Sequence, residues 1–505
     1  MLENIKIEKK YYYTFFSTFL AGTLAHNFLM SNKISFHDDI CSLFGIGSTY
    51  KLGRWGLGII LSLVENTIGK YSIPFWEIMC SLLFIALTAC IVVNLLEIEK
   101  EINCVLFAAI MAVFPAAAVT FMYTFTAGSY FLGLFLAVLA VWLTERKKFG
   151  WIGAIICIAF SLGIYQAYLS VAITISILII MKKCMDEKVR EVVESIIKSG
   201  VIYGGGLLCY FAMVKLSLKL TGSQLSGYMG TDTMMDLSIA TRIRRMRYCY
   251  SDMIKMLHED IVGLTNNFVI RLLVIIILAT LICAVAYYFT RITHIGLKAI
   301  YIGLFIALPI GINLVYPMTS PETEPHAIMR YSLVCIWIAA SFFVGRIKID
   351  SWQKKCIHYA VLISCLGSIL FYAYYDNAAY LKANFMQEQT SSYYTTLITQ
   401  IKSCDGYKDE LPVVYIGKGK IEDLTLSKND KYDIDLTLFN CDLNEWINDF
   451  AYVAYMEHHN GFAPEIIKPE EITEWEEIDK MPIYPDDGSI KVINNKVVVK
   501  FAERE

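Results

Sequence analysis

The sequence predicts an all-α polytopic membrane protein with about eleven membrane-spanning helices and a small soluble C-terminal α/β domain. Of its 505 residues, 56% are hydrophobic and only 18% are charged, whereas ordinary soluble domains carry roughly 25% charged residues. The apolar residues also gather in repeated runs, and a helix needs about 20 of them to cross the hydrocarbon core of a bilayer. Composition and distribution together therefore indicate a chain embedded in lipid.

Eleven apolar runs are the predicted spans. They cover residues 11–30, 74–96, 104–120, 128–144, 151–166, 168–181, 201–216, 268–289, 299–317, 331–345 and 356–375. The first run follows Lys6, Lys9 and Lys10 and has the general look of a signal peptide. Because the run is long and no small-residue cleavage site follows it, we interpret it as a retained helix.

The lysines and arginines of the loops predict the orientation. Three loops carry several of these residues: 145–148, 182–190 and 346–355. The loops at 121–126 and 166–167 carry none. The positive-inside rule therefore places the N-terminus in the cytoplasm. With an odd number of spans, the C-terminal domain lies outside, together with three longer segments, 31–73, 217–267 and 318–330.

Several function classes are disfavoured at this level. The net charge of −3 shows no basic bias, so nucleic acid is not an expected partner. We find no P-loop, no Rossmann fingerprint and no HExxH zinc motif. The middles of the spans are nearly free of Asp, Glu, Lys and Arg, which argues against an ion-coupled transporter, since transporters place ionisable groups at the midplane. We therefore expect the functional residues to lie in the outer segments.

The polar tail predicts a separate domain. Residues 376–505 mix charged helical stretches with strand-like runs, and the proposed division is 1–375 for the membrane domain and 376–505 for the soluble one. Residues 412–416 read as a strand, and 491–500 read as a hairpin that turns at Asn494 and Asn495. No catalytic motif is visible in this tail.

The first outer segment carries the adjacent carboxylates Asp38 and Asp39 after His37. Neighbouring side chains point in different directions, so the two aspartates are expected to have different roles. One could accept a proton from an attacking hydroxyl, and the other could orient an arginine or bind a divalent metal ion such as Mg²⁺ or Mn²⁺. The alternative is a solvated loop in which an aspartate caps the following turn.

The same segment continues with Gly53-Arg54-Trp55. Apolar residues then recur at helical spacing, which predicts an amphipathic helix lying in the membrane interface. Trp55 is expected at the level of the lipid headgroups. Arg54 could hold a lipid phosphate or pair with an aspartate, although an interfacial Arg-Trp pair is also a common anchor.

Two later outer segments supply further cations. The second outer segment contains four arginines in six positions: Arg242, Arg244, Arg245 and Arg247. In a helix, Arg242 and Arg245 share one face and the other two share another. The third segment contains His326 and Arg330 at i, i+4, a spacing that could present both to a phosphate. Anionic lipid headgroups and a plain helix start are the respective alternatives to a donor-phosphate site.

Together these residues resemble a known family. An Asp-Asp pair in the first outer loop, followed by Gly-Arg-Trp at the start of an interfacial helix, is similar to the bacterial glucosyl transferases of the GtrII type. The resemblance is clearest over residues 10–100, and the helix pattern extends it to about residue 375. The resemblance implies a GT-C-like multi-pass protein of the bacterial inner membrane, with its active site on the non-cytoplasmic face.

The resemblance also implies a reaction. The donor is a sugar on a polyprenyl phosphate, the sugar is glucose by family, and the acceptor is a cell-surface glycan. The catalytic role falls on Asp38 or Asp39; Asp38 is favoured as the base, with Asp39 orienting Arg54 or a metal. Arg330 and the arginines at 242–247 are the candidates for holding the donor phosphate. Transfer occurs with inversion. No cofactor is required by the sequence. The alternatives are a polysaccharide polymerase or ligase that uses polyprenyl-linked sugars, and a lipid-oligosaccharide flippase.

Overall fold

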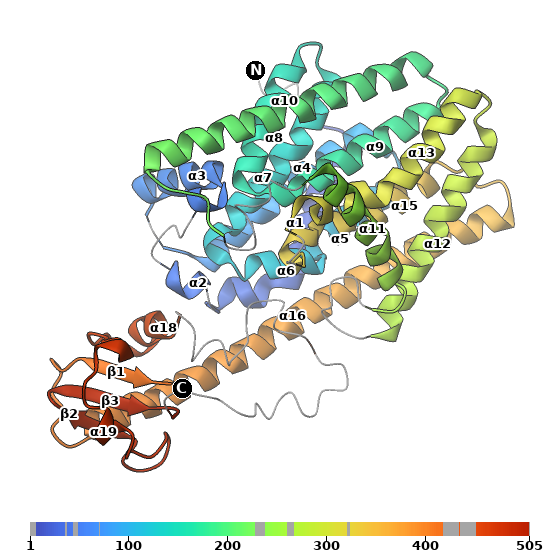
Figure 1. Ribbon diagram of the computed structural model, residues 1–505. Helices are drawn as coiled ribbons and strands as arrows, with labels where there is room; N and C mark the ends of the chain where they lie inside the picture. Colours follow the sequence, from blue (N-terminus) through green and yellow to red (C-terminus); the bar gives the residue numbers. More distant parts are fainter. Residues whose placement is uncertain are drawn as a thin grey trace. The chain divides into compact units, whose positions relative to one another are not determined.

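The computed structural model describes the chain in nine stretches, and most of it is helical (Figure 1). The described residues are 7–35, 38–43, 49–69, 71–227, 238–259, 267–320, 324–417, 434 and 451–503. Their contacts divide the chain into two compact units. The first comprises Met1–Lys33 and Gly45–Ala378, and the second comprises Ile34–Phe44 and Ala379–Glu505. Each unit is described on its own below.

The first unit is a bundle of helices. Its α-helices are α1 (Lys9–Ser31), α3 (Trp55–Thr67), α4 (Pro74–Leu96), α5 (Glu101–Val113), α6 (Pro115–Phe121), α7 (Thr124–Arg146), α8 (Gly150–Ile164), α9 (Leu169–Met185), α10 (Val189–Thr221), α11 (Ile239–Lys255), α12 (Phe268–Arg291), α13 (Ile295–Ile312), α14 (Val315–Met318), α15 (Cys335–Gly345) and the first part of α16 (Trp352–Ser403). Short 3₁₀ helices are η1 (Tyr50–Leu52), η2 (Gln166–Tyr168) and η4 (Ala327–Val334).

Eight helices in the described part of the chain are long and apolar enough to cross a membrane, which confirms the polytopic helical class. They are α4, α7, α9 with η2, α10, α12, α13, α15 with η4, and α16. The count becomes nine if α5 and α6 form one span with a 42° bend. The predicted count of eleven is not confirmed. The two other predicted spans, 11–30 and 151–166, coincide with α1 and the 15-residue α8, which are helical but are not among the eight.

The bend between α5 and α6 follows from Pro115. A proline ring clashes with the preceding turn of a helix and pushes the residue before it into an extended conformation. Phe114 accordingly has φ −66° and ψ 130° and separates the two helices. Its ring is fully buried and meets those of Tyr331, Trp337 and Tyr372 at centroid distances of 5.8–6.2 Å. The bend therefore lies inside an aromatic core.

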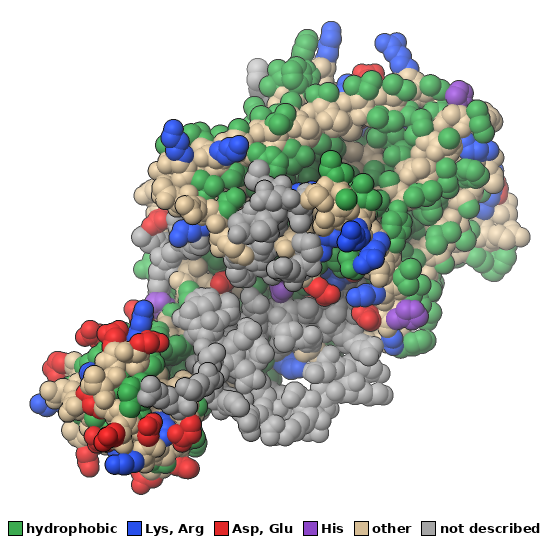
Figure 2. All heavy atoms as spheres, in the orientation of Figure 1, with side chains coloured by type: hydrophobic (Ala, Val, Ile, Leu, Met, Phe, Trp, Pro, Cys, Tyr) green, Lys and Arg blue, Asp and Glu red, His purple; other side chains and the backbone are tan. Residues whose placement is uncertain are grey.

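One end of this bundle is joined by ion pairs. Lys182 is buried and lies 2.6 Å from Glu97. Lys183 pairs with Glu145, and Arg346 pairs with Asp186 at 2.8 Å. These contacts tie together the C-terminal ends of α4, α7, α9 and α15 and thereby gather the three loops rich in Lys and Arg. On the face of the bundle drawn in Figure 2, hydrophobic side chains cover much of the described surface.

The second unit contains a small mixed sheet of strands β1 (Val413–Ile416), β3 (Lys496–Lys500) and β2 (Ile490–Ile493), in that order. β1 is parallel to β3, and β2 is antiparallel to β3. Asn494 and Asn495 turn the hairpin with φ of 45° and 59°, as two-residue hairpin turns of this kind require. The predicted strand and hairpin are confirmed.

Short helices cover this sheet. They are α18 (Ala451–Asn460), η7 (Pro469–Glu471) and α19 (Trp475–Ile478), and α2 (Asp38–Cys41) belongs to the same unit. The apolar core consists of Val414, Ile416, Ile472, Ile478, Met481, Ile493 and Val498. Acidic and basic side chains are mixed over the surface of this unit (Figure 2).

Helix α16 belongs to both units. The predicted span 356–375 lies in its first half, and the helix continues without a break to Ser403. The unit boundary falls between Ala378 and Ala379, inside the helix. The change from apolar to polar composition therefore occurs along one continuous helix of 52 residues.

Candidate active site

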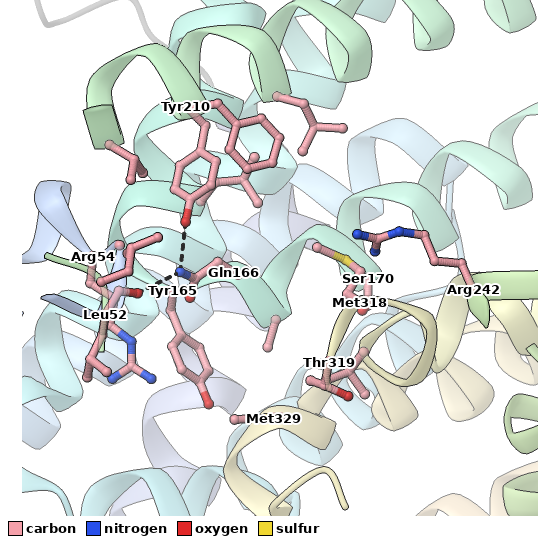
Figure 3. Close-up of a pocket in the computed structure, with 18 residues that line it drawn as sticks. Leu52, Arg54, Tyr165, Gln166, Ser170, Tyr210, Arg242, Met318, Thr319 and Met329 are labelled. Atoms are coloured by element: carbon pink, nitrogen blue, oxygen red, sulfur yellow. Dashed lines mark hydrogen bonds between the residues drawn. The ribbon is translucent and has the colours of Figure 1, made fainter. Parts of the chain in front are cut away.

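A pocket in the first unit collects residues from segments that are far apart in the sequence (Figure 3). Its lining includes residues 52–54, residues 166–167, Leu225 with Arg242, and Met318 with Thr319 and Met329. These four groups come from four of the segments predicted to lie outside. The remaining lining is mainly apolar and comes from α8, α9, α10 and α14. The pocket is thus an apolar cleft with two arginines, Arg54 and Arg242.

Gly53 shapes one edge of this pocket. It has φ 68°, a left-handed conformation that glycine adopts at no steric cost. A Cβ at this position would also lie 2.8 Å from the Tyr210 hydroxyl. The glycine of Gly-Arg-Trp is therefore required both for the turn that ends η1 and for the close approach of α10.

Arg54 follows this turn and is held by two tyrosines. Its Nη1 donates a hydrogen bond of 2.8 Å to the Tyr130 hydroxyl. The guanidinium carbon lies 5.1 Å from the centroid of Tyr165 and 5.8 Å from that of Tyr130, within the range of cation–π contacts. The two rings are stacked on each other at 4.3 Å. The guanidinium group therefore has a fixed position in the wall of the pocket.

Trp55 is buried inside the bundle and does not project from its surface, as a lipid-facing anchor would. Its side chain is only 2% exposed and packs against Phe160 at a ring distance of 4.9 Å. A Cβ on Gly163 would lie 2.6 Å from the indole, and one on Gly56 would lie 3.0 Å from the backbone of Gly163. Small residues on both helices thus let α3 and α8 approach closely enough to bury the indole.

Gln166 is a pocket residue that the sequence analysis did not select. Its Nε2 donates to the carbonyl of Leu52 at 3.3 Å and to the hydroxyl of Tyr210 at 3.0 Å (Figure 3). Because both N–H bonds are used, the orientation of the amide is fixed and its oxygen is left as an acceptor. The sequence did contain a signal for Gln166, because it is a polar residue in the two-residue outer loop 166–167.

Helix α11 presents its arginines on two faces, as predicted. Arg242 donates to the carbonyl of Pro317 at 3.1 Å. Arg245 is 6% exposed and donates to the Tyr316 carbonyl at 2.6 Å and to the Thr319 hydroxyl at 3.1 Å. The two remaining arginines, Arg244 and Arg247, are exposed. One face of α11 therefore binds the α14 segment, and the other faces outward.

Arg330 is paired with Asp252, a residue that the sequence analysis missed. One Nη of Arg330 lies 2.7 Å and 2.9 Å from the two carboxylate oxygens of Asp252, which is 4% exposed. The Tyr316 hydroxyl donates to the same carboxylate at 3.1 Å. Asp252 lies seven residues after Arg245, two helical turns along the same face, which is the signal that was available.

His326 and Arg330 do not share a helical face, contrary to the prediction. η4 is a 3₁₀ helix with a kink at Arg330. Because a 3₁₀ helix has three residues per turn, residues four positions apart point in different directions. The His326 ring instead caps the start of η4, where its Nδ1 accepts a bond of 3.4 Å from the backbone N–H of Ile328. Burial lowers the pKa of His326 below its usual value. The neutral ring thus acts as a helix cap.

Asp38 and Asp39 begin the short helix α2 in the second unit. Asp39 is fully buried and Asp38 is half-buried, so the neighbouring carboxylates have different surroundings. α2 packs against α18, and the nearby backbone N–H of Ser35 donates to the side-chain oxygen of Gln387 at 3.0 Å. The helix is therefore anchored to elements of the C-terminal part of the chain.

The sequence allowed, but did not require, a metal ion at Asp38 and Asp39. Within the residues that the structure describes, no group of three or more His, Cys, Asp and Glu side chains is arranged to hold an ion. His37, which precedes the pair, lies outside the described residues.

One protein-family model matches the part of the chain that contains these residues. The model for the glucosyl transferase GtrII family covers residues 27–338, a range that includes the aspartate pair, the pocket and Arg330. No curated protein and no solved structure matches the chain. The matched range is well over half of the 505 residues. The chain therefore belongs to the GtrII glucosyl transferase family and is a glycosyltransferase with several apolar, membrane-type helices.

Proposed function

We propose that this protein transfers a glucosyl group from a polyprenyl-phosphate carrier to a cell-surface glycan on the extracytoplasmic face of the bacterial inner membrane. Family membership gives glucosyl transfer, and the carrier and the side are our proposal. The observation that supports it best is the apolar pocket with Arg54 and Arg242, which is built from four segments that the positive-inside rule places outside.

The pocket suits the phosphate end of a lipid carrier. The first isoprene units would occupy the apolar lining, because the lipid tail cannot leave the bilayer. Arg54 and Arg242 would hold the phosphate through charge-assisted hydrogen bonds. When the glycosidic bond breaks, negative charge grows on this phosphate, and arginines placed in advance stabilise it without reorganisation. The fixed amide oxygen of Gln166 would accept a hydrogen bond from a donor hydroxyl.

The proposed reaction is a single displacement. The acceptor hydroxyl oxygen forms a bond to the anomeric carbon while the bond from that carbon to the phosphate oxygen breaks. The hydroxyl proton passes to a carboxylate, and polyprenyl phosphate leaves as the anion. Following the family resemblance, Asp38 is the proposed base and Asp39 its support. Attack opposite the leaving group inverts the configuration at the anomeric carbon.

The donor test compares carriers of the same sugar. Purified protein in lipid nanodiscs would receive polyprenyl-phosphate glucose or a nucleotide-activated glucose, with a cell-surface glycan as acceptor. We expect release of polyprenyl phosphate and glucosylation of the glycan only with the lipid donor. Transfer from the nucleotide sugar alone would contradict the proposed carrier. A Lys355→Gln variant, altered at an exposed position outside the proposed site, is the matched control and should retain activity.

The sidedness test is independent of activity. In a background without reactive cysteines, Glu410→Cys places a thiol in the tail and Lys148→Cys places one in the loop after α7; both positions are exposed. An impermeant reagent applied to intact spheroplasts should label the first and spare the second. The reverse pattern would overturn the extracytoplasmic assignment.

A further inference from the structure

A second pocket of the first unit lies between the end of α7, the start of α8 and the first half of α10. It has a volume of about 270 Å³. Its lining comprises Thr144, Lys147, Lys148, Trp151, Ile197, Lys198 and Val201. None of these residues lines the pocket with Arg54 and Arg242. Three lysines and a tryptophan thus converge at a place that glucosyl transfer, as proposed above, does not use.

The charge at this pocket is positive. Lys147 lies over the ring of Trp142 and Lys148 over that of Phe149, at 5.3 Å and 5.6 Å. Across the part of the chain that the structure describes, neither ammonium group forms an ion pair. Lys198 has a partner, Glu194, at 2.7 Å. The local balance over these four charged groups is therefore positive, and an anion would be attracted to it.

The surface next to the lysines is apolar and open. On α8, Ile152 and Ile156 are 51% and 57% exposed. On α10, Ile197 and Val201 are 61% and 48% exposed. Trp151 lies at the boundary between the lysines and these residues and is 44% exposed, a common position for tryptophan at a membrane interface. Positive charge at one end and exposed aliphatic groups below it match an anionic amphiphile.

We infer that this pocket binds the headgroup of an anionic phospholipid, with the phosphate at Lys147, Lys148 and Lys198 and the acyl chains along α8 and α10. Basic pockets between helices at the cytoplasmic surface bind such headgroups. The loop that carries Lys147 and Lys148 is predicted to face the cytoplasm, whose leaflet is anionic. The site would hold α10, which also lines the pocket with Arg54, against α7 and α8.

Native mass spectrometry of the full-length protein tests this inference. Protein released from nanodiscs that contain phosphatidylglycerol should retain bound lipid, and protein from phosphatidylcholine nanodiscs should not. Lys147→Gln/Lys148→Gln should bind phosphatidylglycerol about thirty-fold more weakly, taking roughly 1 kcal/mol for each lysine near an anionic lipid. Lys355→Gln is the matched control, because it removes an exposed lysine from the first turn of α16, within the segment 346–355 that is predicted for the same side.

Two results would overturn the inference. One is that the double variant retains phosphatidylglycerol as the parent protein does. The other is that millimolar inorganic phosphate displaces the lipid, since this would identify a site for free phosphate. A circular dichroism spectrum and a thermal midpoint matching those of the parent would show that the double variant is folded, so that weaker binding reports on the site.

Discussion

The two ends of the helical bundle differ in how they hold their cations, with the Arg330–Asp252 ion pair as the exception at the pocket end. At the end with the Lys- and Arg-rich loops, Lys182, Lys183 and Arg346 each contact a carboxylate. At the end with the pocket, the buried Arg245 is held by a carbonyl and a hydroxyl oxygen, and Arg54 contacts a tyrosine hydroxyl and two rings.

The difference has a physical consequence. A carboxylate partner cancels the field of a cation, so the ion pairs at the first end fasten helix ends to one another. Neutral oxygens fix the position of a guanidinium group and leave its charge in place, as at Arg245, where it adds to the positive potential near the pocket. We therefore expect changes at the ion pairs, including the Arg330–Asp252 pair, to affect stability. Changes at the aspartate pair and at the pocket arginines should affect transfer.

The largest expected effect belongs to the aspartate pair of the first outer segment. Asparagine keeps the size of aspartate and removes its basicity, so Asp38→Asn should lower turnover by roughly 10²–10⁴-fold, as loss of a general base does. Donor affinity should remain. Single-turnover kinetics and a donor-binding measurement would separate the two quantities.

Asp39→Asn is the partner experiment. Asp39 is fully buried, so its variant requires a thermal unfolding curve beside the kinetic assay. If both asparagine variants transfer glucose at the parent rate, the pair only begins the helix α2, and another residue must be the base.

The next effect is on stability and concerns Asp252. Asp252→Asn leaves Arg330 without its carboxylate in a site that is nearly closed to water, and breaking a buried pair in this way costs about 3–5 kcal/mol. Tyr316 would lose its acceptor as well. We expect a lower thermal midpoint in detergent. An unchanged midpoint would mean that the pair does not hold α11 against η4.

The pocket arginines come third. Arg242→Ala and Arg54→Ala should each weaken donor binding by about 2–5 kcal/mol if their contacts to the phosphate are desolvated. Arg244→Ala provides the control because Arg244 lies two residues further along α11 on its exposed face. Isothermal titration with a short-chain polyprenyl-phosphate sugar would measure the difference. A donor affinity of Arg242→Ala equal to that of the parent protein would contradict the prediction and would assign this side chain to lipid headgroups.

The ion-paired end supplies the fourth prediction. Glu97→Gln should cost about 1–2 kcal/mol of stability, less than at Asp252, because the Glu97 side chain is 48% exposed and water screens the pair. The buried Lys182 would still lose its partner. Transfer by the folded fraction should be normal. Loss of turnover without loss of stability would contradict the contrast between the two ends.

The sequence predicts the helices of this protein better than the contacts between them. Apolar runs were sufficient to locate most of the spanning helices, and the spacing of Arg242 and Arg245 was sufficient to predict that they share a face. The burial of Trp55 was not predictable, because it depends on Gly163, which lies more than a hundred residues away on α8. Periodicity shows which face of a single helix is apolar, whereas the contact between Trp55 and Gly163 depends on how two helices pack.

The same reason explains the other differences. Asp252 is an ordinary polar residue until η4 brings Arg330 to it. Gln166 is an ordinary loop residue until η1 and α10 supply its two acceptors. The segment with Asp38 was assigned to the membrane domain by its place in the sequence, but its contacts group it with the tail. Pairings between distant segments are decided by packing, which no local pattern contains.

The smallest effect is a pH dependence at His326. Burial lowers the pKa of this ring in the folded protein, while an unfolded chain has the ordinary value of about 6.5. Protonation therefore favours the unfolded state, so the contribution of His326 to stability is complete above about pH 6.5 and is lost as the pH falls through the lower folded value.

His326→Asn can keep an acceptor for the helix cap and cannot titrate. The thermal midpoint of the parent should fall more between pH 7.5 and pH 5 than that of the variant. Parallel curves would show that the ring is already solvated, and would reopen a charged, phosphate-facing role for it at the pocket end.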